Sequence, residues 1–234
     1  MADQRINLVE SRVKEIADNL VSGLGENCNI FLDTSAVIDL AHEIRIRGKS
    51  NPRFTPVAFY NLFNEYLNDR VYVTDEILAE SKTHNGSAIN GNSIISHSTI
   101  DFLSLFNDRY HRVINEESFK KSFSEIDRDV YWAGLAAFDK NHKKCKDDPI
   151  SYTDRKLLSA ALHFRGRRDS SESAILSCDC HLSRTAEILS GNGLEYLFNV
   201  SSNIRPDLNN EEFIQSIPAF NYTPIRVVSL RGKH

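Results

Sequence analysis

Residues 29–40 read NIFLDTSAVIDL, and this stretch decides the fold class. A short apolar run ends abruptly at Asp33, two hydroxyl residues follow, and a second apolar series begins. An apolar run of this length between Asn and Asp predicts a buried strand, and the residues after it predict a helix over 35–47. The aspartate that ends this strand is the feature to be explained.

Strands and helices alternate along the rest of the chain. Thr55 followed by Pro56 is a strong helix start, with the threonine as N-cap. The pattern predicts further strands at 71–73, 174–177, 194–200 and within 225–230, and helices at 6–20, 55–67, 75–82, 100–142, 151–164 and 181–189. Because the strands are apolar throughout, we expect an α/β protein, with a three-layer α/β/α arrangement around a central, mostly parallel sheet. Such sheets bind ligands at the carboxyl ends of their strands.

Composition narrows the class of protein. The 234 residues suffice for one sizeable domain with additions, and the net charge of −4 lacks the basic excess typical of nucleic-acid-binding proteins. No apolar stretch is long enough to cross a bilayer and no export signal is visible, so we expect a cytoplasmic protein without membrane contact. The four cysteines are then reduced thiols. Cys178 and Cys180 beside His181 make a poor zinc motif, because no matching distant pair accompanies them.

Four acids stand near predicted strand ends. Asp33 ends the first strand, Glu80 lies about one helical turn past the second, Asp154 opens a later helix, and Asp179 follows the third strand by two residues. In a parallel sheet they would converge on one edge, where clustered carboxylates are stable only around a cation or when some are protonated. Hard oxygen ligands without a histidine or cysteine cluster suit Mg²⁺ or Mn²⁺.

Each acid also has a purely structural explanation. Asp33 would cap the helix after it, and Asp154 would form a capping box with Ser151. Glu80 would be a solvated helix residue and Asp179 a turn residue. For each acid alone the structural explanation is favoured, while the order of the four along the chain, each near a strand end, favours a metal site.

Other uses of a strand-end aspartate fit less well. A phosphatase of the aspartyl-phosphate type needs a second aspartate where this chain has Ser35. The glycine fingerprints of dinucleotide-binding and nucleoside-triphosphate-binding folds are absent. A receiver-like domain would need paired acids after the first strand and a lysine late in the sheet, and neither is evident.

The ordered set of acids resembles the pattern of the PIN domain, a family of metal-dependent nucleases. The stretches that carry the resemblance are IFLDTSAVIDL, VYVTDEILAES, PISYTDRKLLSAAL and AILSCDCHLSRTA. The family pattern implies four catalytic metal ligands and two supporting hydroxyls, namely Asp33, Glu80, Asp154 and Asp179 with Ser35 and Ser177. Glu76 is an alternative to Glu80. Cys178 and Cys180 flank Asp179 where family members often carry a further acid.

The resemblance covers roughly residues 28–83 and 149–200 and implies a domain organisation. Its parts are an N-terminal helix packed on the domain (1–27), a PIN-like nuclease domain (28–200) with a mostly helical insertion at about 84–148, and a C-terminal extension (201–234). Glycine and asparagine favour turns, so the stretch 84–99 predicts a mobile start of the insertion. It would close over RNA or form a homodimer contact.

By the same resemblance the protein would be an endoribonuclease that hydrolyses RNA phosphodiester bonds with one or two Mg²⁺ or Mn²⁺ ions. It would act in RNA processing or decay, or as the toxin of a toxin–antitoxin pair with a protein inhibitor as partner. A catalytically inactive PIN-like module that binds RNA or protein is the alternative. Basic residues that could follow the RNA backbone, or be solvated surface, are Arg45, Arg47, Lys49, Lys143 and Lys144.

Overall fold

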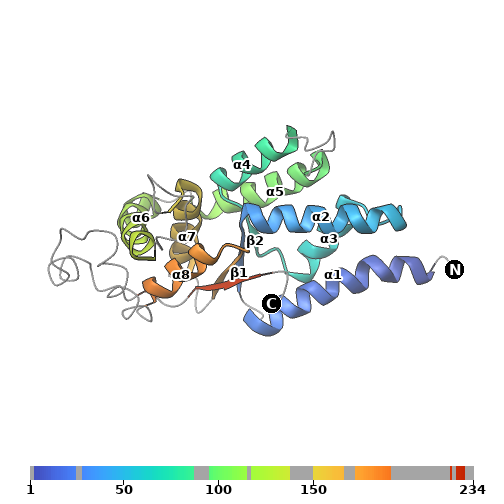
Figure 1. Cartoon of the computed structure of the whole chain (residues 1–234), viewed down its shortest axis with the longest axis horizontal. Helices are drawn as coiled ribbons and strands as arrows, with labels where there is room; N and C mark the ends of the chain where they lie inside the picture. Colours follow the sequence, from blue (N-terminus) through green and yellow to red (C-terminus); the bar gives the residue numbers. More distant parts are fainter. Residues whose placement is uncertain are drawn as a thin grey trace. The chain divides into compact units, whose positions relative to one another are not determined.

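The computed structural model describes residues 3–24, 28–86, 95–114, 117–137, 150–165, 172–190, 222 and 225–229. The chain divides into two compact units (Figure 1). The first unit comprises residues 1–115, 170–178 and 228–234, and the second comprises 116–169 and 179–227. Among the described helices, none combines the length and apolar character that a membrane crossing requires.

A small sheet of four strands confirms the expected α/β class. Its strands are β1 (Asn29–Leu32), β2 (Val71–Tyr72), β3 (Ser173–Leu176) and β4 (Arg226–Val228), in the spatial order β2-β1-β3-β4. β1 pairs in parallel with both neighbours, so that Ile30 faces Val71 on one side and Ala174 on the other. All residues of β1, β2 and β3 are buried, as their apolar sequences predict.

The described residues of the first unit contain five helices, and a local sequence signal marks the start of the third. They are α1 (Asp3–Leu24), α2 (Thr34–Ser50), α3 (Pro56–Tyr66), α4 (Asp75–Gly86) and α5 (His97–Ile114). Thr55 caps α3 as predicted, because its hydroxyl accepts a hydrogen bond from the Ala58 N–H at 3.2 Å. Phe59, Tyr60 and Phe63 of α3 are fully buried and form the aromatic core of this unit with neighbouring rings.

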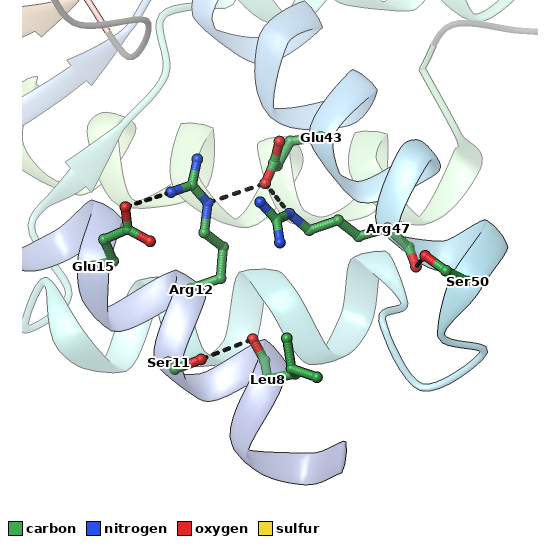
Figure 2. Close-up of polar contacts among 7 residues, drawn as sticks. All are labelled: Leu8, Ser11, Arg12, Glu15, Glu43, Arg47 and Ser50. Atoms are coloured by element: carbon green, nitrogen blue, oxygen red, sulfur yellow. Dashed lines mark hydrogen bonds and ion pairs between the residues drawn. The ribbon is translucent and has the colours of Figure 1, made fainter. Parts of the chain in front are cut away.

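The N-terminal helix α1 is part of the core of the first unit. Val9, Val13, Ala17 and Leu20 are buried along one of its faces, and α1 packs against α3 (Figure 1). A polar network ties it to α2 as well. In Figure 2, Glu43 of α2 accepts a hydrogen bond from Arg12 of α1 at 3.0 Å and a second one from Arg47.

The second unit is mainly helical in its described part. α6 (Glu117–Ala137) packs against both α7 (Tyr152–Arg165) and α8 (Cys180–Leu189). α6 needs a glycine at one point of close approach, because a Cβ at Gly134 would lie 2.6 Å from the Ile150 side chain. Helices α5 and α6 confirm the predicted helical structure within residues 100–142 over the described part of that range, while the assignment of 84–148 as an insertion stays a prediction.

Some expectations fall outside the described residues. These are half of the predicted mobile start, at 87–94, the strand at 194–200, the C-terminal extension over 201–221, and the lysine-rich stretch at 138–149.

Candidate functional site at the carboxyl ends of β1 and β3

The strand order creates a switch point in the sheet. From β1 the chain continues to β2 on one side, whereas β3 lies on the other side of β1. In open parallel sheets, ligands bind outside the carboxyl ends of the two strands between which the order reverses. Asp33 and Ser35 follow β1, and Ser177 and Cys178 follow β3. The Asp33 N–H donates a hydrogen bond to the Leu176 carbonyl at 3.0 Å, so the pairing of β1 with β3 continues to this edge of the sheet.

The Asp33 carboxylate is buried, with 5% of the residue exposed, and it accepts three hydrogen bonds. The Thr34 N–H donates to Oδ1 at 2.7 Å. The hydroxyls of Ser35 and Ser177 both donate to Oδ2, at 2.5 and 2.7 Å. Because a carboxylate oxygen offers two lone pairs, Oδ2 is saturated while Oδ1 can accept one further partner.

Two further features stabilise negative charge at Asp33. The residue is the N-cap of α2, where the helix dipole favours an anion. The Ser35 hydroxyl, which donates to Asp33, also accepts a hydrogen bond from the Cys178 N–H at 3.0 Å. Segments that are far apart in the sequence thus fix the orientation of one carboxylate.

A buried hydroxyl beside Asp33 lacks a hydrogen-bond partner. Thr34 is 5% exposed, and its Oγ1 makes no hydrogen bond in the structure. An unpaired buried polar group costs about 1 to 3 kcal/mol, so such atoms often mark a place that a water, an ion or a ligand completes. The free lone pair of Asp33 Oδ1 and the Thr34 hydroxyl are hard oxygen donors, and they fit Mg²⁺ or Mn²⁺.

Cys178 contacts a carboxylate that the sequence did not single out. Its thiol lies 3.1 Å from Oδ2 of Asp39, which is half-buried on α2. Cys28, Cys178 and Cys180 form no disulfide. No signal in the sequence pointed to Asp39, because the contact depends on the position of Cys178 after β3.

Glu80, the second predicted acid, lies on α4 in the first unit and is half-buried. α4 packs against α2, the helix that Asp33 caps. Glu76 is also half-buried and precedes Glu80 by one turn, so the two share a face of the helix. Both therefore stay candidates for the second acid.

Asp154 and Asp179 belong to the second unit, and both stabilise helix starts. The Ser151 hydroxyl accepts from the Asp154 N–H at 3.0 Å and donates to Asp154 Oδ2 at 2.7 Å, which confirms the predicted pairing of these two residues. Asp179 is exposed and caps α8, accepting from the His181 N–H at 2.7 Å. An aspartate directly before a helical pattern is a capping signal, and it could have found this role. A common site for the four acids stays a prediction from the sequence.

The predicted basic residues differ in their surroundings. Arg45 and Lys49 are exposed on α2. Arg47 instead pairs with Glu43, which also pairs with Arg12 (Figure 2). Lys143 and Lys144 lie outside the described residues.

Comparisons of the chain with protein-family models, with curated proteins and with solved structures find no match. Within the described ranges, no group of three or more histidine, cysteine, aspartate and glutamate residues is arranged to hold a metal ion. The geometry around Asp33 is therefore the basis for assigning a function.

Proposed function

We propose that this protein is a Mg²⁺- or Mn²⁺-dependent endoribonuclease with a three-layer, PIN-like arrangement. One observation carries the proposal. At the switch point of the parallel sheet, the buried Asp33 carboxylate is held by serine hydroxyls that follow two adjacent strands. A helix cap alone needs neither burial nor these two donors, whereas a metal ligand needs a fixed orientation.

The donors at this edge suit a cation that shares its coordination with substrate. Mg²⁺ usually keeps several waters and is bound by one or two carboxylates together with substrate phosphates. Asp33 would bind through Oδ1, the oxygen that has a lone pair left. Glu80, Asp154 and Asp179 are the further ligands that the resemblance implies. When bound, such a cation activates water and neutralises charge on a phosphodiester.

The two serines would act as positioning residues. By donating to Oδ2, Ser35 and Ser177 fix the rotamer of Asp33 and leave Oδ1 as the oxygen with capacity for a ligand. Partners of this kind orient metal ligands in other proteins, and losing one typically costs about 10- to 100-fold in affinity or activity.

The test is cleavage of a mixed pool of RNAs in Mn²⁺ by the wild-type protein and by Asp33→Asn. The substitution keeps the size of the side chain and removes its charge, so we expect cleavage to fall by roughly 100-fold or more. Asp108→Asn on α5 is the matched control, because it removes the same charge from an exposed position. Thermal melting of both variants controls for folding.

The outcomes separate the alternatives. Cleavage by a folded Asp33→Asn protein at the wild-type rate would falsify the proposed role of Asp33. RNA binding by a wild-type protein that does not cleave would instead favour the catalytically inactive module.

A further inference from the structure

Tyr152, the first residue of α7, is exposed to solvent over 55% of its surface. It is the one aromatic residue among the exposed large apolar side chains of the described ranges. A single exposed apolar residue needs no explanation by itself. What distinguishes Tyr152 is the pair of cations that contacts its ring.

Arg155 and Lys156 hold the ring from within the second unit. The guanidinium carbon of Arg155 lies 5.4 Å from the ring centroid of Tyr152, and the Lys156 Nζ lies 5.1 Å from it. Both residues follow Tyr152 by about one helical turn, so they approach the ring from α7. Each cation also contacts a second ring on α6. Arg155 lies 5.7 Å from the Tyr131 centroid, and Lys156 lies 4.7 Å from that of Phe123.

One carboxylate anchors both cations. Asp127 Oδ1 lies 3.0 Å from Lys156 Nζ and 3.3 Å from Arg155 Nε. The two basic side chains are only 22% and 17% exposed, so they cannot easily swing away from the ring. Two positive charges share one negative charge in this trio. The exposed ring is therefore held in place and backed by positive charge before any ligand arrives, which lowers the entropy cost of binding.

We infer that Tyr152 is a stacking platform for a nucleobase of single-stranded RNA. This inference rests on the proposed function, because that function supplies the substrate class. Proteins bind single strands by stacking bases on aromatic rings, with arginine adding cation–π attraction and positive charge attracting the backbone. An exposed, cation-backed ring has the required features.

The platform lies on the same helix as one of the predicted acids. Tyr152 precedes Asp154 by two residues on α7, which is about 3 Å along the helix axis. Side chains two residues apart on a helix point to nearly opposite sides, so a base stacked on Tyr152 would not lie against the Asp154 carboxylate. The platform would hold another, unpaired nucleotide of the bound strand, and it would favour single-stranded over duplex RNA.

The test measures RNA binding by fluorescence anisotropy in EDTA, so that cleavage does not interfere. The probe is a labelled single-stranded RNA of about 12 nucleotides, within the range that such proteins cover. Tyr152→Phe keeps the ring and should bind within about twofold of the wild type, whereas Tyr152→Leu keeps apolar bulk without a planar face and should bind roughly tenfold more weakly. Duplex RNA of the same sequence should show no dependence on Tyr152, because its bases are not available for stacking.

Each outcome of this test supports or overturns the role proposed for Tyr152. Equal binding by wild type and Tyr152→Leu overturns the platform, as does a wild-type protein that binds no single-stranded RNA. Thermal melting checks that the exposed substitution leaves the fold intact. If the platform and the proposed function both hold, Tyr152→Leu raises KM and keeps kcat in Mn²⁺, while Asp33→Asn loses cleavage and keeps binding in EDTA. If RNA binding depends on Tyr152 but the wild-type protein cleaves no RNA, the stacking role of Tyr152 is supported and the proposed nuclease activity is wrong.

Discussion

Asp33 and Asp179 each come shortly after a strand and directly before a helix, and each caps that helix. Asp179 is exposed and accepts a backbone hydrogen bond from the helix that it caps. Asp33 is buried and accepts, besides a backbone N–H, the hydroxyls of Ser35 and Ser177. Two aspartates with the same local role therefore differ in burial: the carboxylate of Asp33 is withdrawn from water and that of Asp179 is not.

This difference between Asp33 and Asp179 shows which features of the Asp33 environment helix capping does not require. A helix start needs one oxygen acceptor, which can stay in water. Burying a carboxylate costs far more and is tolerated only when donors or cations compensate it. The arrangement around Asp33 goes beyond the needs of α2, whereas the hydrogen bond that Asp179 accepts from the His181 N–H is what the start of α8 requires.

Asp33→Ala should have the largest effect on stability. It removes the acceptor of three donors in a buried place, so we expect the free energy of unfolding to fall by about 2 to 4 kcal/mol. Urea denaturation at neutral pH measures this change. A loss under about 1 kcal/mol would mean that Asp33 acts only as a helix cap and contributes no more to stability than Asp179 does.

Ser177→Ala should come next. Ser177 is buried, and its hydroxyl donates to Asp33 Oδ2, so the loss should be about 1 to 2 kcal/mol. Ser35→Ala removes the other donor to the same oxygen. Because the two serines share one acceptor, the double variant should deviate from additivity by roughly 0.5 kcal/mol or more, and strictly additive losses would argue against a shared network.

Asp179→Ala should cost about 1 kcal/mol, the usual value for a helix cap. Asp179→Asn should be nearly neutral for stability, because asparagine caps about as well as aspartate. The proposed function adds a sharper expectation, since a metal ligand cannot be replaced by an amide. Cleavage in Mn²⁺ should therefore fall in Asp179→Asn although its urea midpoint stays at the wild-type value. Retained cleavage would reduce Asp179 to a cap.

Ser151→Ala should have the smallest effect, about 0.5 to 1 kcal/mol. It removes the hydroxyl that accepts from the Asp154 N–H and donates to the Asp154 carboxylate at the start of α7. Thermal denaturation of this variant beside Ser177→Ala compares an exposed serine at a helix start with a buried serine at the edge of the sheet. A larger loss in Ser151→Ala would reverse the ranking.

Much of the framework could be predicted from the sequence because its signals are local. The apolar run before Asp33 predicted β1, the Thr55–Pro56 pair predicted the start of α3, and the SYTD stretch predicted the pairing of Ser151 with Asp154. Each signal depends on residues within one turn or one strand, where backbone geometry and capping chemistry act directly. The parallel class followed from strands that are apolar throughout.

Only the tertiary structure decided which residues meet at the edge of the sheet. Ser177 donates to Asp33 across 144 residues of sequence, and this contact exists because β3 lies beside β1. The tertiary structure also decided that Arg47 pairs with Glu43, while Arg45 is exposed on the same helix. It decided as well that the Thr34 hydroxyl is buried without a hydrogen-bond partner. The order of strands and the burial of each side chain depend on the packing of all elements together. The sequence therefore determined the elements and the capping residues, and long-range packing turned one of those caps into a buried, oriented carboxylate.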